Sequence, residues 1–439
     1  MTVTHTRIQH GVGQGSFHSA SVEVSELGRR YRFDYVYDCG AGANQPTKAL
    51  TRCIKRLDLV SRVGEVSTKS YLDLLVLSHF DQDHINGVEQ LAKQCTIGRM
   101  VVPYVGIEEL SLLIASQAVE VKTIQALHEF LHGEKRLWGI PVTMIKTGSR
   151  GEENFESTEF PPEIVNEIAV DVDTPHKMTI VAAGSGKELG QEHEDGKDIH
   201  IDSMAGLAKW KLRFWNRGLD KKILEAVENR LKSIGFPFGM VASKNSIDGL
   251  INWVKENKPK LHCAYREAIK DCHSDWAVST GNLPNFISVG MYSGPSFRFT
   301  GIKTKYWRIA SGEPVFWPCE WRYRARRFRA RAGWLGTGDA PLGESSYWND
   351  FNAHYKNELP KASTILIPHH GAASASGPRS FNPGLIYKPG VVAVISFGTN
   401  NTYGHPKTSV LEQIFSKDGD IQCVTENTVP GFCEFFGFE

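Results

Sequence analysis

The chain has 439 residues, of which 41% are hydrophobic and 23% charged, as is typical of a globular protein with one large domain and an insertion, or with two to three domains. The formal net charge of +1 excludes a strong field over the whole surface, so nucleic-acid binding would have to come from a local patch. The N-terminal segment lacks the pattern of a signal peptide, and no run approaches the roughly 18 apolar residues that cross a bilayer, so we expect a cytoplasmic protein without a membrane partner.

Residues 7–38 predict strands separated by tight turns. Hydrophobicity alternates from Ser19 to Val24, and a second apolar run ends in Asp38, where the glycine-rich segment 39–42 begins. Asp38 is at this point either a turn-forming aspartate or a functional carboxylate at a strand end. Residues 47–60 predict a helix.

Four metal-binding side chains follow the next apolar run, 74–77, within six residues: His79, Asp81, Asp83 and His84. Alternate residues of an extended segment share a face, so His79, Asp81 and Asp83 can converge, while His84 opens a helix beside Asp83. Two imidazoles and two carboxylates suit zinc, manganese or iron. The alternative is a surface turn rich in His and Asp, but burying such groups without a partner or a metal would cost several kcal/mol.

The segment after this cluster alternates helix and strand, which is the pattern of a sheet covered by helices. Helices are expected at 85–94 and 107–132, and strands at 99–105, 142–145 and 178–182. The fold class is therefore α/β.

The composition shifts at about Gly184, after which helical patterns dominate. They cover residues 207–215, 219–234, 247–256 and 262–276. We predict a first half of the main fold at 1–186, a mainly helical insertion at 187–280 and the second half at 281–439.

A basic segment at 321–331, WRYRARRFRAR, interleaves six arginines with aromatic residues. Arg324, Arg326 and Arg329 would bind the phosphates of a nucleic acid in one interpretation. A solvated hairpin strand would produce the same pattern.

Strands in the C-terminal part again end in metal-binding or polar residues. LGTGDA carries Asp339, the buried run 364–368 precedes His369 and His370, and the run 391–397 leads to a loop with Asn401 and His405. A last pair of strands is expected near 422–438. Side chains from several strand ends that meet at one sheet edge are how open α/β proteins build active sites.

Five motifs occur in order along the chain: GVGQGSF, SHFDQDHINGV, LGTGDA, IPHHG and YGHP. SHFDQDHINGV resembles the second motif of the metallo-β-lactamase fold, usually H-x-H-x-D-H, with Asp81 in the place of the second histidine. The other four are similar to motifs in the hydrolase domain of ComEC-type competence proteins. The resemblance covers about 8–105 and 282–410 and leaves out the helical insertion.

This resemblance implies an αββα sandwich with a dinuclear metal centre at its open edge, holding two divalent ions, Zn²⁺ or Mn²⁺. His79 and Asp81 would bind one ion, Asp83 and His84 the other, and Asp339 would bridge them. One of His369 and His370 would complete a metal shell.

The remaining site residues are also assigned through the resemblance. Asp38 would orient the nucleophilic water or a ligand histidine, and His405 and Asn401 would contact the substrate phosphate. The sequence departs from the family at Ser16, where an acidic residue is usual, and lacks the attached membrane channel. His176 is the only plausible stand-in for a further family histidine, and a capping or surface histidine is the alternative for it.

We therefore expect a metal-dependent phosphodiesterase that cleaves DNA or RNA by a metal-activated hydroxide. Asp83 or Asp38 would orient the hydroxide, and His405 or the free member of the His369 and His370 pair would protonate the leaving oxygen.

Two other readings stay open. One is a hydrolase of a small molecule, such as a cyclic nucleotide, a phosphorylcholine-like ester or a lactone, with the insertion as a lid. The other is a subunit of a multi-protein system, with a protein partner on the insertion. The sequence does not indicate an oligomeric state.

Overall fold

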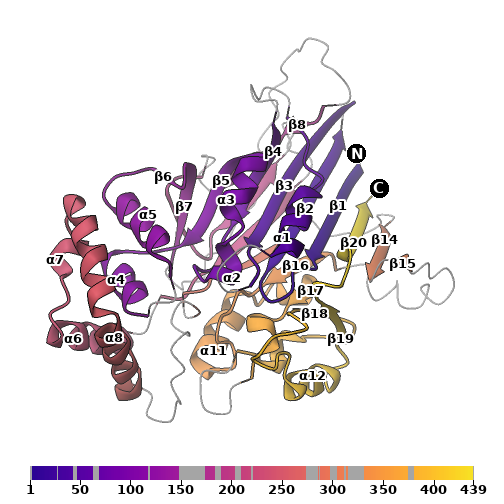
Figure 1. Cartoon of the computed structure of the whole chain (residues 1–439). Coiled ribbons are helices and arrows are strands. Elements are labelled where there is room, and N and C mark those ends of the chain that lie inside the picture. The colour runs from indigo at the N-terminus through magenta and orange to yellow at the C-terminus, as the bar shows by residue number, and fades with distance from the viewer. Residues whose placement is uncertain are drawn as a thin grey trace.

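Two β-sheets and the helices around them form a mixed α/β protein in this computed structural model (Figure 1). The description covers residues 2–26, 28–42, 47–62, 69–116, 119–147, 174–182, 189–202, 209–218, 221–272, 285, 287–296, 304–310, 313–314, 331–373 and 380–438. The α/β class expected from the sequence is confirmed.

The larger sheet has the strand order β10-β7-β5-β4-β3-β2-β1-β20-β14-β15, with β6 paired to β7 and β8 to β3. The strands are β1 (Thr2–His10), β2 (Phe17–Glu26), β3 (Arg29–Cys39), β4 (Ser70–Val76), β5 (Cys95–Pro103), β6 (Arg136–Leu137), β7 (Ile140–Lys146), β8 (His176–Lys177), β10 (Glu192–Glu194), β14 (Thr304–Ala310), β15 (Glu313–Pro314) and β20 (Gly431–Phe438). β3, β4, β5 and β7 are parallel, so their carboxyl ends lie at one edge.

The smaller sheet has the order β19-β18-β17-β16-β13-β12-β11-β9. Its strands are β9 (Thr179–Ala182), β11 (Asp198–Asp202), β12 (Lys209–Trp215), β13 (Gly290–Pro295), β16 (Gly333–Gly336), β17 (Ala362–Leu366), β18 (Val392–Ser396) and β19 (Asp420–Val424). β16 to β19 are parallel, which gives this sheet a carboxyl edge of its own.

The helices lie outside the two sheets and in a group at one end of the larger one (Figure 1). They are α1 (Lys48–Lys55), α2 (Gln82–Ile85), α3 (Val88–Gln94), α4 (Ile107–Ser116), α5 (Val121–Leu131), α6 (Lys221–Ser233), α7 (Phe238–Val241), α8 (Ile247–Cys272), α11 (Ser345–His354) and α12 (Thr408–Phe415).

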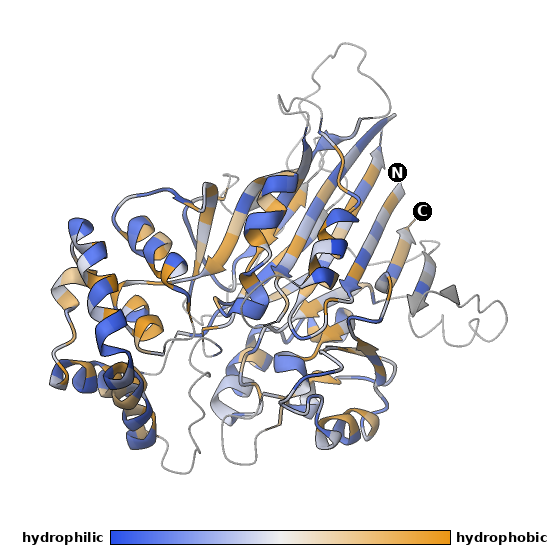
Figure 2. Ribbon diagram, in the orientation of Figure 1, coloured by the Kyte–Doolittle hydropathy of each residue, from blue (hydrophilic) through white to orange (hydrophobic). Residues whose placement is uncertain are grey.

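Alternation along the strands gives the sheets two different apolar faces (Figure 2). In β3, Tyr35 and Tyr37 belong to the core between the sheets, whereas Val36 belongs to the core under the helices. Tyr35 donates a hydrogen bond to Ser293 Oγ at 2.9 Å and Tyr37 donates to the Val289 carbonyl at 2.6 Å. These bonds tie the larger sheet to the smaller one.

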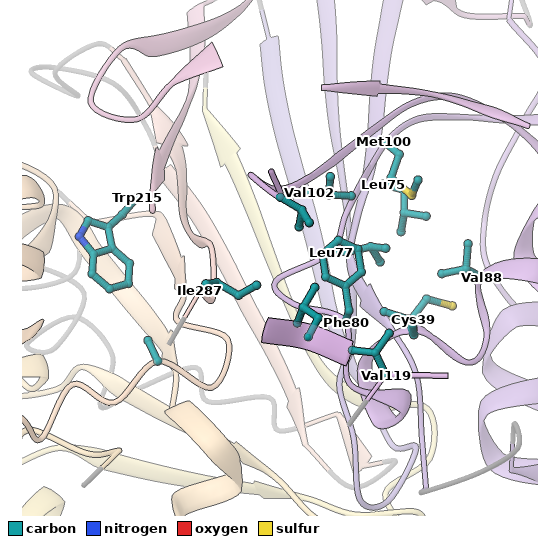
Figure 3. Packing of buried hydrophobic residues seen from close by; sticks show 14 of the residues in the cluster. Cys39, Leu75, Leu77, Phe80, Val88, Met100, Val102, Val119, Trp215 and Ile287 are labelled. Atoms are coloured by element: carbon teal, nitrogen blue, oxygen red, sulfur yellow. The ribbon is translucent and has the colours of Figure 1, made fainter. Parts of the chain in front are cut away.

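The core under the helices supports the segment that carries the first cluster of metal-binding residues. Leu75 and Leu77 lie with Val102 and Phe80 in this core, beside the start of α2 (Figure 3). All four side chains are buried. The turn after β4 is therefore held by apolar packing on its inner side, and its polar residues point the other way.

A buried ion pair within the larger sheet also bonds to the smaller one. Arg7 on β1 donates to Glu434 Oε2 on the neighbouring β20 at 2.8 Å, and to Ser363 and Thr364 on β17 at 2.8 and 2.9 Å. Tyr306 donates to the other oxygen of Glu434 at 2.8 Å. Burial would raise the pKa of Glu434, but Arg7 and these hydrogen bonds hold it below its usual value.

Two predictions about elements are wrong. Residues 207–215 were expected to be helical, but Lys209–Trp215 is β12, because its buried Trp210, Leu212 and Phe214 recur with period two. The two helices expected at 247–256 and 262–276 are one helix over Ile247–Cys272, α8, which runs through Pro259, and residues 273–276 lie outside the description.

The two strands expected near 422–438 are present as β19 and β20. They pair with other strands, β19 with β18 and β20 with β1 and β14.

The predicted insertion 187–280 contains both strands and helices. β10, β11 and β12 pair with strands of the two sheets. Helices α6, α7 and α8 follow at 221–272 and pack against α4 and α5. The predicted helix 107–132 consists of α4 and α5, with residues 117–118 between them outside the description.

Within the described ranges, none of the helices combines the length and the apolar character needed to cross a lipid bilayer.

Candidate metal centre

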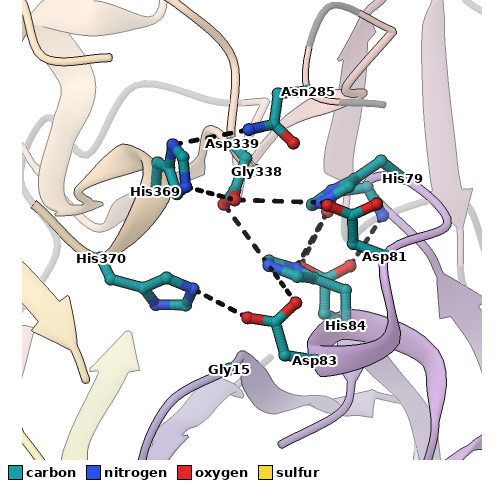
Figure 4. A network of polar contacts seen from close by, with 12 residues as sticks. Gly15, His79, Asp81, Asp83, His84, Asn285, Gly338, Asp339, His369 and His370 are labelled. Atoms are coloured by element: carbon teal, nitrogen blue, oxygen red, sulfur yellow. Dashed lines mark hydrogen bonds and ion pairs between the residues drawn. The ribbon is translucent and has the colours of Figure 1, made fainter. Parts of the chain in front are cut away.

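Strand ends from both sheets bring a set of histidines and aspartates together, which we call the His/Asp cluster (Figure 4). Its members are His79, Asp81, Asp83, His84, Asp339, His369 and His370. The first four follow β4, Asp339 follows β16, and the two last histidines follow β17. The convergence expected from the sequence is thus present.

Asp339 lies at the middle of the cluster. Its Oδ2 is 3.9 Å from His79 Nε2 and 3.7 Å from His369 Nε2, while its Oδ1 is 3.4 Å from His84 Nε2. The two oxygens of one carboxylate therefore face different histidines.

A second group forms around Asp83. His370 Nε2 lies 3.3 Å from Asp83 Oδ2, and His84 Nε2 lies 4.0 Å from Asp83 Oδ1. On the opposite side, Asp81 Oδ2 lies 3.6 Å from His79 Nε2. His369 is thus on the side of His79 and Asp81, and His370 on the side of Asp83 and His84.

Hydrogen bonds behind the cluster fix the tautomers of three histidines. Asp38 Oδ2 accepts from His84 Nδ1 at 2.8 Å and from the Ser78 hydroxyl at 2.9 Å, so this hydroxyl in turn accepts from His79 Nδ1 at 2.9 Å. The Ser396 carbonyl accepts from His370 Nδ1 at 2.8 Å. Each Nδ1 is therefore the nitrogen that donates away from the cluster, and Nε2 is the nitrogen that faces the cluster and would bind a metal after losing any proton it carries.

The charges of the cluster depend on one another. Burial would raise the pKa of Asp339, but His369 and His84 hold it well below its usual range. Burial would likewise raise the pKa of Asp83, which His84 and His370 lower to about 2. Burial would lower the pKa of His84, and Asp339 and Asp38 raise it well above the ordinary value. Asp339 and Asp83 are thus held in the ionised form that binds metal, whereas burial raises the pKa of Asp81.

Three residues at this edge have left-handed backbone angles. The φ angles are 58° for Asp38, 49° for His369 and 56° for His370. Such conformations cost on the order of 1 to 3 kcal/mol each in residues other than glycine and gather at functional sites. Here they direct the side chains that follow β3 and β17 toward the cluster.

Two glycines let the N-terminal loops pass close to α2. A Cβ atom added at Gly15 or Gly40 would lie 2.5 Å from the carbonyl oxygen of Asp83. That oxygen accepts a hydrogen bond from the Ser16 backbone at 3.1 Å. The glycines of the GVGQGSF motif and of the segment after Asp38 thus support the backbone that presents Asp83 and His84.

His405 and Asn401 lie in the loop after β18. The His405 ring is 5.6 Å from the His369 ring, and burial followed by the charge of His369 lowers the pKa of His405 to about 4. The Asn401 side chain accepts from the His405 backbone at 2.9 Å and donates to the His405 carbonyl at 2.9 Å. Asn401 therefore holds the loop, and its contact with substrate stays a prediction.

Two other predicted groups do not join the cluster. His176 pairs through β8 with Tyr31, at the opposite end of β3 from Asp38, so it is not the missing ligand. Arg324, Arg326 and Arg329 lie outside the described residues, and their role stays a prediction.

The sequence analysis missed Asn285 and Ser78. Asn285 is 5% exposed, and its Nδ2 lies 3.5 Å from His369 Nδ1 (Figure 4). Its Oδ1 is buried and has no hydrogen-bond partner in the part of the chain that the structure describes. Asn285 precedes β13, and the other site residues also lie next to strands. The sequence analysis considered only histidine and acidic residues as metal ligands and therefore did not consider this amide.

The donor set fits divalent metal ions. His79 Nε2, His84 Nε2 and Asp81 Oδ1 are buried and have no hydrogen-bond partner among the described residues. In each of two groups of residues, the three ligand atoms lie within 4.8 Å of one another. One group is His79, His84 and Asp339, and the other is Asp83, His84 and His370. Neutral imidazoles and carboxylates are ligands for zinc and manganese.

No model of a protein family matches the chain, and no curated protein matches it either.

Proposed function

We propose that the chain is a metal-dependent phosphodiesterase that cleaves DNA or RNA. The observation that carries this proposal is the position of Asp339, whose two oxygens face different histidines, His79 and His84. One carboxylate that serves two ions is characteristic of sites that clamp a phosphodiester between metals.

The αββα sandwich of the metallo-β-lactamase fold is part of the proposal. Two sheets tied face to face, helices on their outer sides and a polar cluster at one edge support it. The order of the five motifs supports the hydrolase branch that resembles the ComEC-type domain.

One ion would be held by His79, Asp81 and His369 with Asp339 Oδ2, and the other by Asp83, His84 and His370 with Asp339 Oδ1. A pair of Zn²⁺ or Mn²⁺ ions supplies a water of lowered pKa and neutralises charge on the phosphate. Asn285 Oδ1 could add a neutral oxygen ligand beside His369.

The protein groups around the ions have separate tasks. Asp38 and Ser78 orient His84 and His79 through their Nδ1 protons. Asp83, whose side chain is 23% exposed, would orient the attacking water, because Asp38 is occupied behind the cluster. His405, neutral near pH 7, would donate a hydrogen bond to a phosphate oxygen.

The test is a cleavage assay with protein stripped of metal and reloaded with Mn²⁺ or Zn²⁺. The substrates are single- and double-stranded DNA, RNA and bis(p-nitrophenyl) phosphate, and the variants are Asp339→Ala and the exposed control Asp248→Ala. Polynucleotide cleavage that only Asp339→Ala loses supports the proposal. Cleavage of the small ester alone would refute the nuclease activity and favour a small-molecule hydrolase.

A further inference from the structure

Tyr403 lies on the surface beside the His/Asp cluster. Its side chain is 62% exposed, which is unusual for a large aromatic ring, and its ring stacks on the His405 ring at 5.7 Å with 29° between the planes. The His405 ring lies 5.6 Å from the His369 ring at 80°. Three rings thus lead from the cluster to solvent.

The loop that carries Tyr403 is fixed at both ends. Asn401 bonds to both backbone groups of His405, and the Lys407 backbone donates to the Gly371 carbonyl, directly after His370, at 3.0 Å. Gly404, with φ of 67°, makes the left-handed turn between the two stacked rings. The position of Tyr403 relative to the cluster is therefore set by the fold.

A positive charge lies in the same loop. The Lys407 ammonium donates to the backbone carbonyl of Tyr403 at 2.8 Å. Proteins that bind single-stranded nucleic acids combine exposed aromatic rings with nearby cations, because every base has a face that can stack and every nucleotide brings a phosphate.

We propose that Tyr403 is a stacking subsite for the nucleobase next to the phosphodiester bound at the cluster. The inference rests on the proposed phosphodiesterase function and adds where the substrate is held: the polynucleotide enters as a single strand along the loop of Tyr403. Recognition is by the face of the base, so it tolerates any sequence.

The experiment compares substrates that differ only in their bases. The metal-loaded full chain is assayed with a short single-stranded oligothymidylate and with an abasic oligomer of the same length and charge. The p-nitrophenyl ester of thymidine 5′-monophosphate tests a single nucleotide. The variants are Tyr403→Ala, Tyr403→Phe and Tyr403→Trp, with Tyr387→Ala as the control, since Tyr387 is a second exposed tyrosine in another loop.

Tyr403→Ala is expected to raise KM for oligothymidylate about tenfold, with kcat nearly unchanged, and to shrink the preference over the abasic oligomer by the same factor. The Phe and Trp variants should keep the parent KM, and so should Tyr387→Ala. If Tyr403→Ala raises KM only for the nucleotide ester, the subsite is supported, but the base that stacks on Tyr403 belongs to a mononucleotide and not to a polynucleotide.

Three results would overturn the subsite. The first is an unchanged preference of Tyr403→Ala for oligothymidylate over the abasic oligomer, and the second is an equal rise of KM in Tyr387→Ala. The third is a fall of kcat on both oligomers in Tyr403→Ala, which would make Tyr403 only a support for His405. If the parent protein cleaves oligothymidylate in these cases, the proposed function stands and this inference alone fails. A parent that hydrolyses only bis(p-nitrophenyl) phosphate contradicts both.

Discussion

Asp38 accepts a hydrogen bond from His84 Nδ1 at 2.8 Å, and the opposite nitrogen of the same ring lies 3.4 Å from Asp339. A carboxylate can only accept, so this bond fixes the proton on Nδ1 and leaves Nε2 free for a metal. Asp38 therefore acts on the metal centre through His84, without facing substrate itself.

Replacing Asp38 with Asn should lower metal affinity about 10- to 100-fold, because an amide cannot fix the tautomer in the same way. Competition with a chromogenic chelator measures the affinity, and circular dichroism checks the fold. Asp248→Asn, an exposed change in α8, is the matched control. A folded variant with the affinity of the parent would exclude this positioning role.

Asp339→Ala should lose most of both ions, since each oxygen of Asp339 faces a different set of ligands. Asp83→Ala removes a group from one side only and should lose mainly one ion. Elemental analysis of the purified variants gives the metal content per chain. Two ions retained in Asp339→Ala would refute the bridging role.

Asn285→Ala should weaken metal binding, whereas Asn285→Asp should preserve or strengthen it, because a carboxylate oxygen replaces the buried amide oxygen. Titration calorimetry with Mn²⁺ distinguishes the two variants. Equal binding by both variants and the parent would assign Asn285 to support of His369 alone.

The contribution of His10 to stability should fall as the pH drops below about 6.5. Burial lowers the pKa of His10 to about 3, so the unfolded chain takes up a proton that the folded chain does not. His10 therefore leaves the free energy of unfolding unchanged at pH 7.5 and lowers it by about 2 kcal/mol at pH 5. The buried His5 and His18, whose pKa values are also lowered by burial, add to this loss.

Urea unfolding between pH 5 and 7.5 measures the effect. His10→Gln keeps a donor for Ser19, which lies 2.7 Å from His10 Nε2, but does not titrate. Its free energy of unfolding should depend less steeply on pH than that of the parent. Identical slopes would mean that His10 is accessible to protons in the folded chain.

Glu434→Gln should destabilise the protein by about 3 to 5 kcal/mol, because Arg7 would remain buried without its counter-charge. The double variant Arg7→Met/Glu434→Leu should recover part of this loss, since it removes both charges. Chemical unfolding at pH 7 gives the values. The account would be contradicted if the double variant lost more stability than Arg7→Met and Glu434→Leu lose together as single variants.

The sequence was most informative where residue type and strand ends coincide. Apolar runs that end in His79, Asp339 or His369 could be placed at one sheet edge, because parallel strands share their carboxyl edge. The helix prediction failed at Lys209–Trp215, although lysine and arginine alternate there with Trp210, Leu212 and Phe214 in the period of two that is typical of a strand. Asn285 was not predicted because an amide is a rare metal ligand. The sides of the cluster on which His369 and His370 lie depend on backbone angles that no local sequence pattern predicts.

The Arg7–Glu434 pair has a kinetic meaning as well. The two residues are 427 positions apart in the chain and lie on neighbouring strands. Closing so long a loop costs entropy before any contact compensates it, and folds rich in such distant contacts form slowly. The larger sheet can be completed only after its most distant segments have met. The His/Asp cluster, whose members span residues 79 to 370, would be assembled late in folding, and ions would be bound by a chain whose architecture is already nearly complete.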